Sequence, residues 1–163
     1  GSTGFGKSLI NAADGEFAGR MHEDLIDAVN WAVAAGVTTP EQVAIFGGSY
    51  GGYATLVGLT FTPESFACGV DIVGPSSLVT LIESFPEYWK PFLEATWYRS
   101  VGDPRTVAGR AALLARSPIT RVDQIRRPLL VAQGANDPRV TRLESDQLVA
   151  AMKARGIPVT YVL

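Results

Sequence analysis

The sequence predicts an α/β fold: a mostly parallel sheet with helices on both faces. Short apolar runs rich in β-branched residues alternate with helix-length segments, and glycine or proline bounds most of the runs. The runs are continuous rather than alternating with polar residues, which is typical of parallel strands buried on both faces. With 163 residues, the chain is long enough for one domain with a substantial core.

The expected elements follow one another in a regular order. Residues 23–36 place Leu25, Ile26 and Val29 at helical spacing and end at Gly36, which predicts the first helix. Strands are expected at residues 42–48, 66–74, 127–134 and 158–163, and further helices at residues 50–61 and 143–156. Pro128 stands at the start of the third strand, where a missing N–H is tolerated.

A segment of different character, residues 76–127, separates the second and third strands. Aromatic side chains gather in residues 85–98, and prolines interrupt the surrounding chain. We expect Tyr88, Trp89 and Trp97 to line a substrate pocket. A packed lid or a domain contact is the alternative for the same residues.

Composition excludes several classes of function. The net charge of −2 gives no electrostatic reason to expect nucleic acid or an anionic membrane as a partner. No apolar run approaches the ~20 residues that span a bilayer, and no signal-peptide pattern is present. The single cysteine, Cys68, is expected to be a buried structural thiol, and with one histidine the chain offers few ligands for zinc. We therefore expect no metal and no cofactor, and a cytoplasmic setting is compatible with the composition.

The stretch "IFGGSYGGYA", residues 45–54, carries the strongest functional signal. It contains the residues of a nucleophile elbow, Gly47, Gly48, Ser49, Tyr50, Gly51 and Gly52, in the pattern G-x-S-x-G after an expected strand and before an expected helix. Such a turn exposes Ser49 to a general base, and we expect side chains at Gly47 and Gly51 to clash there. Gly52 is expected to allow close packing of the helix on the sheet. The Tyr50 amide would face an oxyanion. The alternative interpretation of the whole stretch is a glycine-rich turn in which the serine has no catalytic role.

A nucleophile elbow predicts an acid in the loop after a later strand. Asp137 follows the expected strand at residues 127–134, and Pro138 favours an extended loop conformation for it. Asp123 precedes that strand, Asp71 lies inside a strand, and Asp146 lies on a helix facing mostly solvent. Asp137 is therefore the expected triad acid, although "NDP" is also ordinary turn chemistry.

The expected histidine is missing from its position. His22 is the only histidine, and it precedes Ser49, whereas the hydrolase order puts the base last. We expect His22 to have a surface or helix-capping role. The base is expected in a loop after Leu163, so the chain is interpreted as truncated at both ends, without the histidine loop and the upstream strands.

The stretches "GGSYGGYA", "SPI", "RPLLVAQGANDPRV" and "GSTGFGKS" together resemble the catalytic domain of the prolyl oligopeptidase family of serine peptidases. The resemblance covers nearly the whole chain and is strongest to the acylaminoacyl-peptidase and dipeptidyl-aminopeptidase branches. It implies a partial α/β-hydrolase fold over residues 1–163, with Ser49 as nucleophile, Asp137 as triad acid and Tyr50 N–H in the oxyanion hole. It also implies short peptides, or acylated or unmodified peptide N-termini, as substrates, and an N-terminal β-propeller in the parent protein.

Other interpretations stay open. A carboxylesterase-type hydrolase shares the elbow and the fold, and oligomerisation is possible. The first eight residues also spell G-x-x-x-x-G-K-S, a nucleotide-binding loop with Lys7 and Ser8 in the phosphate and magnesium roles, but Asp14-Gly15 follows too soon for a long helix. Without the histidine of the triad, and with residues 43–48 as an unpaired apolar sheet edge, we expect the isolated chain to be poorly soluble or partly ordered, and inactive.

Overall fold

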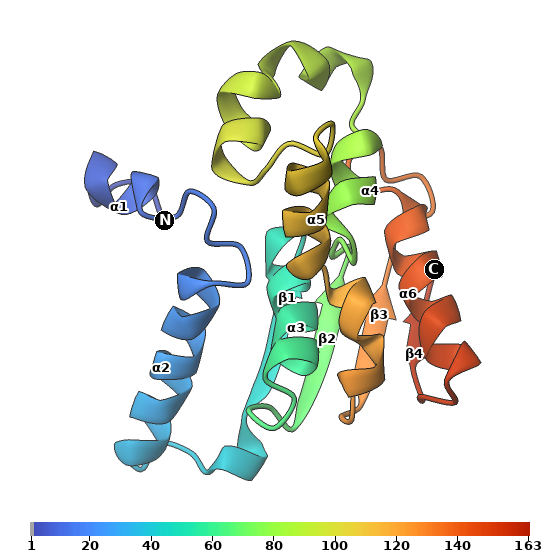
Figure 1. Cartoon of the computed structure of the whole chain (residues 1–163). Coiled ribbons are helices and arrows are strands. Elements are labelled where there is room, and N and C mark those ends of the chain that lie inside the picture. The colour runs from blue at the N-terminus through green and yellow to red at the C-terminus, as the bar shows by residue number, and fades with distance from the viewer. Residues whose placement is uncertain (1) are drawn as a thin grey trace.

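A computed structural model describes residues 2–163 of the chain (Figure 1). The elements are α1 (Lys7–Asn11), α2 (Arg20–Ala34), η1 (Pro40–Gln42), β1 (Ala44–Gly48), α3 (Tyr50–Phe61), β2 (Cys68–Ile72), α4 (Leu78–Glu83), η2 (Glu87–Phe92), η3 (Glu94–Tyr98), α5 (Val107–Ala115), η4 (Pro118–Gln124), β3 (Leu129–Ala132), α6 (Arg142–Ala154) and β4 (Thr160–Val162). All four expected strands and the three expected helices are present, with shifts of a few residues at their ends.

The sheet is parallel throughout, with strand order β1-β2-β3-β4. This confirms the α/β class. The strands lie in the sheet in the same order as in the sequence, and connections between parallel strands are right-handed. Every crossover connection therefore passes over the same face of the sheet. The expectation of helices on both faces is therefore met on one face only among residues 2–163, where α3, η4 and α6 pack (Figure 1).

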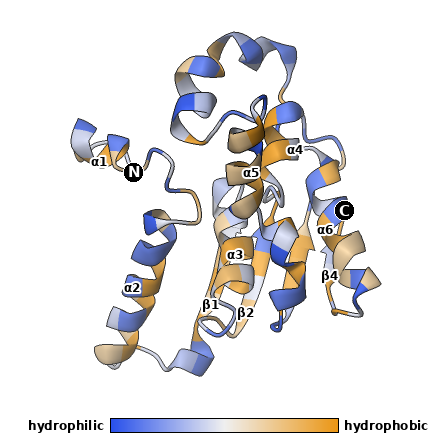
Figure 2. Cartoon of the chain, viewed as in Figure 1, coloured by the Kyte–Doolittle hydropathy of each residue, from blue (hydrophilic) through white to orange (hydrophobic). Residues whose placement is uncertain are grey.

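Helix α3 lies at the centre of the core because it is apolar around most of its circumference. Leu56 and Leu59 belong to a cluster that joins the strands and α6, whereas Tyr53 and Val57 belong to a second cluster with α4 and α5. Figure 2 shows apolar residues concentrated along α3, α4 and α5. Burial on several sides fixes the position of this helix, and its first residue directly follows Ser49.

The second face of the sheet is apolar and carries no helix of the described chain. Phe46, Val70 and Leu130 are neighbours across β1, β2 and β3, and Phe46 is 70% exposed. Cys68, expected to be buried, is half-buried because it lies on this uncovered face. The exposed apolar face and the free edge of β1 both support the expectation that the isolated chain is poorly soluble.

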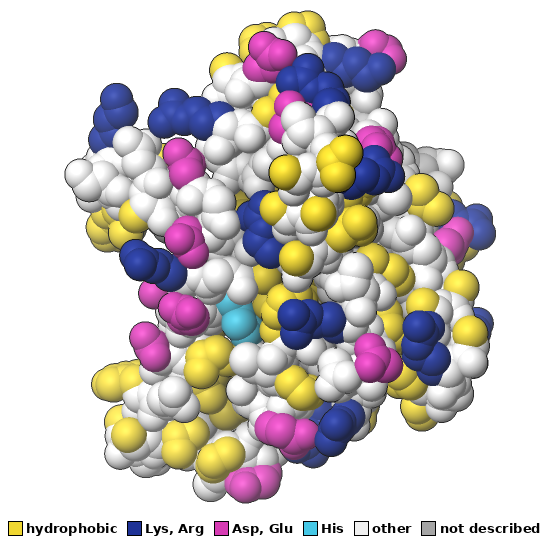
Figure 3. Space-filling model, viewed as in Figure 1, with side chains coloured by type: hydrophobic (Ala, Val, Ile, Leu, Met, Phe, Trp, Pro, Cys, Tyr) yellow, Lys and Arg dark blue, Asp and Glu magenta, His cyan; other side chains and the backbone are white. Residues whose placement is uncertain are grey.

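Residues 76–127 form a helical segment in which α4, η2 and η3 lie toward the carboxyl ends of the strands, whereas η4 packs beside α3 on the face of the sheet (Figure 1). Phe85 packs against the rings of Trp89 and Trp97, with centroids 4.9 and 4.6 Å away. Acidic and basic side chains are intermixed on the face shown in Figure 3, without a large basic patch. Among residues 2–163, none of the helices combines the length and the apolar character needed to cross a bilayer.

Candidate active site

Ser49 lies at the turn from β1 into α3 in a strained backbone conformation. Its φ of 56° and ψ of −117° are unfavourable for a residue with a Cβ. Two hydrogen bonds hold the turn: Ser49 N–H donates to the Ile72 carbonyl (2.9 Å), and Tyr53 N–H donates to the Ser49 carbonyl (3.0 Å). Ser49 is exposed, so its side chain is available to a ligand. This is the geometry of a strand–turn–helix elbow.

The two glycines expected to avoid clashes differ in the structure. A Cβ at Gly47 would overlap the backbone of Gly51, so Gly47 is required by the close approach of the strand end to the first turn of α3. A Cβ at Gly51 would meet nothing within 4 Å. The expected clash at Gly51 is therefore wrong: it is the Gly51 backbone, rather than a side chain there, that occupies the crowded space.

This difference predicts that alanine substitutions at Gly47 and Gly51 change the stability of the protein by unequal amounts. Gly47→Ala is expected to destabilise the protein by about 3 kcal/mol or more, since backbone atoms cannot move aside cheaply. Gly51→Ala is expected to change stability by less than about 1 kcal/mol, because it adds a good helix former in open space. Apparent Tm values for both variants measure this; equal losses at the two positions would contradict the assignment of the crowding to Gly47.

The other two glycines of the elbow also differ. A Cβ at Gly48 would make only an ordinary contact, 3.8 Å from the Ile72 carbonyl oxygen. A Cβ at Gly52 would overlap the Asp71 carboxyl and the backbone of Gly74. Gly52 thus allows α3 to pack closely on the end of β2.

Tyr50 is the first residue of α3, so its N–H has no acceptor within the helix. Free amides at a helix N-terminus attract negative charge, which suits an oxyanion. The Tyr50 ring packs edge-on against Phe17, with centroids 4.8 Å apart, and burial raises the pKa of its hydroxyl. Tyr50 and the exposed Ser49 line the same region of the surface.

That region is a cavity of about 430 Å³ beside Ser49. It is lined by Ile10, Ala13, Asp14, Phe17, Met21, Ser49, Tyr50, Tyr53, Pro75, Trp97 and Ser100. Aromatic rings form much of the wall, a lining suited to an apolar side chain. The sequence did not identify Phe17 or Tyr53 as cavity residues. Phe17 precedes the first expected helix, in a stretch without periodicity, and a tyrosine inside a helix such as Tyr53 is typical of the hydrophobic core.

The three aromatic residues expected at a pocket are divided. Trp97 lines the cavity with Ser49, whereas Tyr88 and Trp89 are not among its lining residues. Trp89 packs against Phe85 instead, and Tyr88 is 61% exposed on η2. The packed-segment alternative therefore describes Trp89 better, whereas Tyr88 lies mostly in solvent.

Arg116 ties the two sides of this cavity together. Its guanidinium donates to the carbonyls of Gly15 (3.0 Å) and Val101 (2.6 Å), and Gly15 N–H donates to the Ser100 carbonyl (2.7 Å). The chain around Asp14 is thereby held against the end of the segment that carries Trp97. Long-range contacts of this kind have no local sequence signal.

Asp137 lies in the loop after β3, as expected. Its Oδ1 accepts the N–H groups of Arg139 (2.8 Å) and Val140 (3.0 Å), and the Gln133 side-chain amide donates to the carbonyls of Gly134 and Val140 (3.0 Å each). These hydrogen bonds fix the conformation of the loop from residue 133 to residue 140. Among residues 2–163 no hydrogen bond uses Asp137 Oδ2, which leaves this oxygen for another donor.

Ser49 and Asp137 share one edge of the sheet. Each follows the carboxyl end of a parallel strand, β1 and β3, with only β2 between them. Strands in a sheet lie about 4.8 Å apart, so the ends of β1 and β3 are separated by about 10 Å. An imidazole that bridges a serine and a carboxylate fits a gap of that order.

The rival acids have other partners or positions. Asp123 lies in η4, before β3, and is exposed. Asp146 accepts from the Tyr161 hydroxyl (2.8 Å) and from Arg142 (2.7 Å) on α6. Asp71 is fully buried in β2, below the elbow. None of the three is placed like Asp137.

His22 is buried, which corrects the expected surface or capping role. Its Nε2 lies 2.9 Å from the Thr62 hydroxyl, and desolvation lowers the pKa of the ring although Glu23 opposes this; a small part of the ring is visible in Figure 3. Thr62 follows α3, whereas Ser49 precedes it, and a helix of 12 residues is about 18 Å long. The interpretation that His22 is not the base agrees with this position.

The alternative nucleotide-binding loop has little structural support. Lys7 and Ser8 lie in α1, which contains five residues, none of them buried. Gly1, the first glycine of that pattern, lies outside the described residues. Within the described chain no cluster of His, Cys, Asp and Glu is suited to hold a metal ion.

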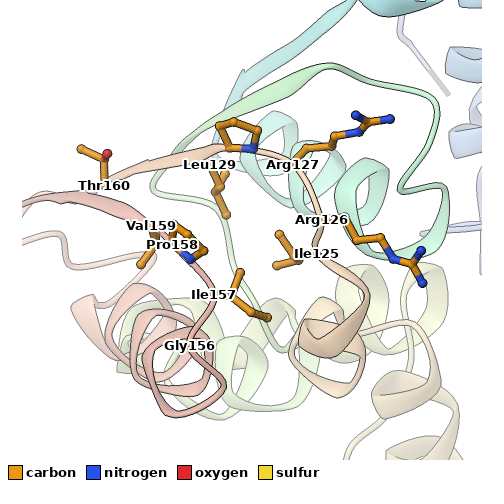
Figure 4. Close-up of a pocket in the computed structure, with 10 residues that line it drawn as sticks. Ile125, Arg126, Arg127, Leu129, Gly156, Ile157, Pro158, Val159 and Thr160 are labelled. Atoms are coloured by element: carbon orange, nitrogen blue, oxygen red, sulfur yellow. The ribbon is translucent and has the colours of Figure 1, made fainter.

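A second cavity, of about 450 Å³, lies at the opposite edge of the sheet (Figure 4). It opens at the amino ends of β3 and β4, and Ile125, Leu129 and Ile157 contribute apolar walls. Its lining includes no carboxylate and no histidine. Chemistry of the kind expected at Ser49 therefore belongs to the first cavity.

A parallel sheet crossed by α3, a strained serine turn after β1 and an acid loop after β3 define the α/β-hydrolase class, represented here in part. A family model described as the prolyl oligopeptidase family matches residues 1–163. The chain belongs to this family of serine peptidases, which confirms the resemblance seen in the sequence.

Three known proteins illustrate the similarity. The chain is 68% identical to dipeptidyl aminopeptidase BIII of Pseudoxanthomonas mexicana and 52% identical to dipeptidyl peptidase family member 6 of Caenorhabditis elegans, each over all 163 residues. It spans about a quarter of these relatives, 24% and 22% of their lengths. The structure of a puromycin-hydrolyzing peptidase of Mycobacterium tuberculosis superposes with a TM-score of 0.86 at 28% identity, covering 99% of this chain and 23% of that one.

Proposed function

We propose that residues 1–163 carry the nucleophile and the acid of a serine peptidase that cleaves short peptides or acylated or unmodified peptide N-termini. The observation that supports this most strongly is the backbone of Ser49, a non-glycine residue at φ 56° between β1 and α3. Such strain persists only where the surrounding structure over-determines it, and it is common at active sites. Membership of a peptidase family supports the same chemistry.

The proposed reaction is acyl transfer. Ser49 Oγ attacks the carbonyl carbon of the substrate while its proton passes to a histidine held by Asp137. The tetrahedral oxyanion accepts the N–H of Tyr50. The carbon–nitrogen bond then breaks, the histidine returns the proton to the leaving amine, and water releases the acyl group from Ser49 by the reverse sequence.

The histidine is proposed to come from outside residues 1–163, in a longer protein of which this chain is one part. Three points support a longer protein: the relatives are about four times the length of this chain, the β1 edge is unpaired, and His22 is remote from Ser49. An N-terminal β-propeller is proposed as the additional domain. Residues 1–163 alone are proposed to be inactive.

A carboxylesterase is the second candidate, since the aromatic cavity beside Ser49 would accept the acyl part of an ester equally well. We expect the longer protein to hydrolyse an aminoacyl or dipeptidyl amide more efficiently than a simple acetate ester with a comparable leaving group. The kcat/KM for the amide should be at least about tenfold higher, because peptide binding adds contacts that a small acyl group lacks. Parallel rate measurements on both substrates test this. A preference for the ester would identify the esterase instead.

A further inference from the structure

Asp71 is a buried carboxylic acid that the proposed reaction does not use. It is fully buried, and it faces the helix side of the sheet beside Gly47 of β1 and Val131 of β3. Its Oδ1 accepts the N–H of Gly74 (2.8 Å), whereas Oδ2 is buried without a hydrogen-bond partner among the described residues. An unpaired buried carboxyl oxygen is costly, so its position calls for a compensating role.

Asp71 lies between two strained turns. Ser49 has φ 56°, and Val73, a β-branched residue, has φ 49°. The two turns are adjacent, because Gly48 pairs with Ile72 and Ser49 N–H donates to the Ile72 carbonyl. Val73 N–H donates to Ala132 of β3 at 2.8 Å. Hydrogen bonds between the ends of β1, β2 and β3 therefore keep both turns in their strained backbone conformations.

The Asp71 carboxyl occupies the space between the first turn of α3 and the turn after β2. A Cβ at either Gly52 or Gly74 would overlap Asp71 Oδ1 and also the backbone of the other glycine. Asp71 therefore contacts the first turn of α3 on one side and the turn after β2 on the other. Pro75, which follows Gly74, lines the cavity with Ser49.

We propose that Asp71 is a positioning residue for Ser49, and that its buried carboxyl, in the neutral form, holds the first turn of α3 and the turn after β2 in the arrangement that presents the hydroxyl. The inference rests on the proposed function, in which Ser49 is the nucleophile. It assigns Asp71 no contact with substrate: the residue acts through Gly52 and Gly74.

The charge state follows from the surroundings. Burial raises the pKa of Asp71 to about 7, although the Gly74 N–H opposes the shift. The residues described around it, Gly47, Gly52, Gly74 and Val131, are uncharged, and burial raises the pKa of Tyr50 and of Tyr53 on α3, which keeps both hydroxyls neutral. Above about pH 7 the ionised carboxylate would disfavour the oxyanion at the same helix N-terminus and leave a buried charge unpaired.

The test is the rate at which a fluorophosphonate probe labels Ser49 in the longer protein, measured from pH 5 to pH 9. Asp71→Asn keeps an acceptor for Gly74 and cannot ionise, Asp71→Ala removes the contact, and Ser49→Ala is the probe control. Met152→Ala is the stability control, because Met152 is fully buried in the cluster with α6, away from the elbow. Circular dichroism confirms that each variant is folded at the assay temperature.

We expect Asp71→Ala to slow labelling by about 100-fold, as a displacement of about 1 Å does, and Met152→Ala to change it by less than about threefold. Wild type is expected to label more slowly above pH 7. Asp71→Asn is expected to stay within about fivefold of wild type at pH 6 and to lack that decline. Equal losses in Asp71→Ala and Met152→Ala, or coincident pH profiles of wild type and Asp71→Asn, would overturn the inference. Labelling that persists in Ser49→Ala would instead refute the proposed nucleophile.

Discussion

Replacing Ser49 by alanine in the longer protein is expected to lower kcat for a chromogenic peptide amide by about 10⁴- to 10⁶-fold while the protein stays folded. The substitution removes the hydroxyl that forms the acyl-enzyme, but the turn is held by backbone hydrogen bonds to Ile72 and Tyr53, which alanine retains. Steady-state kinetics with an unchanged apparent Tm measure this separation of activity from stability.

Ser65→Ala is the matched control for that experiment. Ser65 lies in the turn between α3 and β2, beyond the far end of α3 from Ser49. Its replacement is expected to leave kcat within about twofold of wild type, as surface changes away from a site do. A Ser49→Ala variant that retains a tenth or more of the wild-type kcat would exclude Ser49 as the nucleophile.

Asp137→Asn is expected to lower kcat by about 10⁴-fold with little change in KM. Asn can still accept the N–H groups of Arg139 and Val140 at its side-chain oxygen, so the loop should keep its shape. The atom in the place of Oδ2 becomes a donor, and it can no longer orient a histidine N–H or stabilise the imidazolium.

Asp123→Asn serves as the control, because Asp123 is exposed on η4 before β3. Its kcat is expected to equal that of wild type within error. If Asp137→Asn retained wild-type kcat, or if Asp123→Asn lost activity to the same extent, the acid of the triad would have to be sought elsewhere in the longer protein.

The elements that sequence reasoning predicted best are those with local signals. β1 and β3 were marked by continuous apolar runs, α3 by a run of small and apolar residues, and α6 by helical periodicity, with glycine or proline at most of the boundaries. The elbow was predictable because G-x-S-x-G between a strand and a helix combines a motif with its structural context. The position of Asp137 followed from the order of strands, since carboxyl ends of parallel strands meet at one edge.

Features that depend on packing between distant segments were predicted poorly. The uncovered sheet face, with Cys68 half-buried on it, follows from the consecutive strand order, which composition does not reveal. The contact of His22 with Thr62 joins residues 40 positions apart. The elbow requires glycine at position 47 rather than 51 because the backbone of Gly51 lies where a Cβ of residue 47 would be, a close approach that only the folded chain reveals.

We propose that the turn at position 49 presents a nucleophile. Treatment of the longer protein with a fluorophosphonate, followed by mass spectrometry of the peptide that contains residues 45–61, shows whether Ser49 carries the adduct. We predict stoichiometric modification at Ser49, with loss of peptidase activity in proportion to labelling. Loss of activity with the adduct on a different residue, or full activity in a protein modified at Ser49, would contradict it.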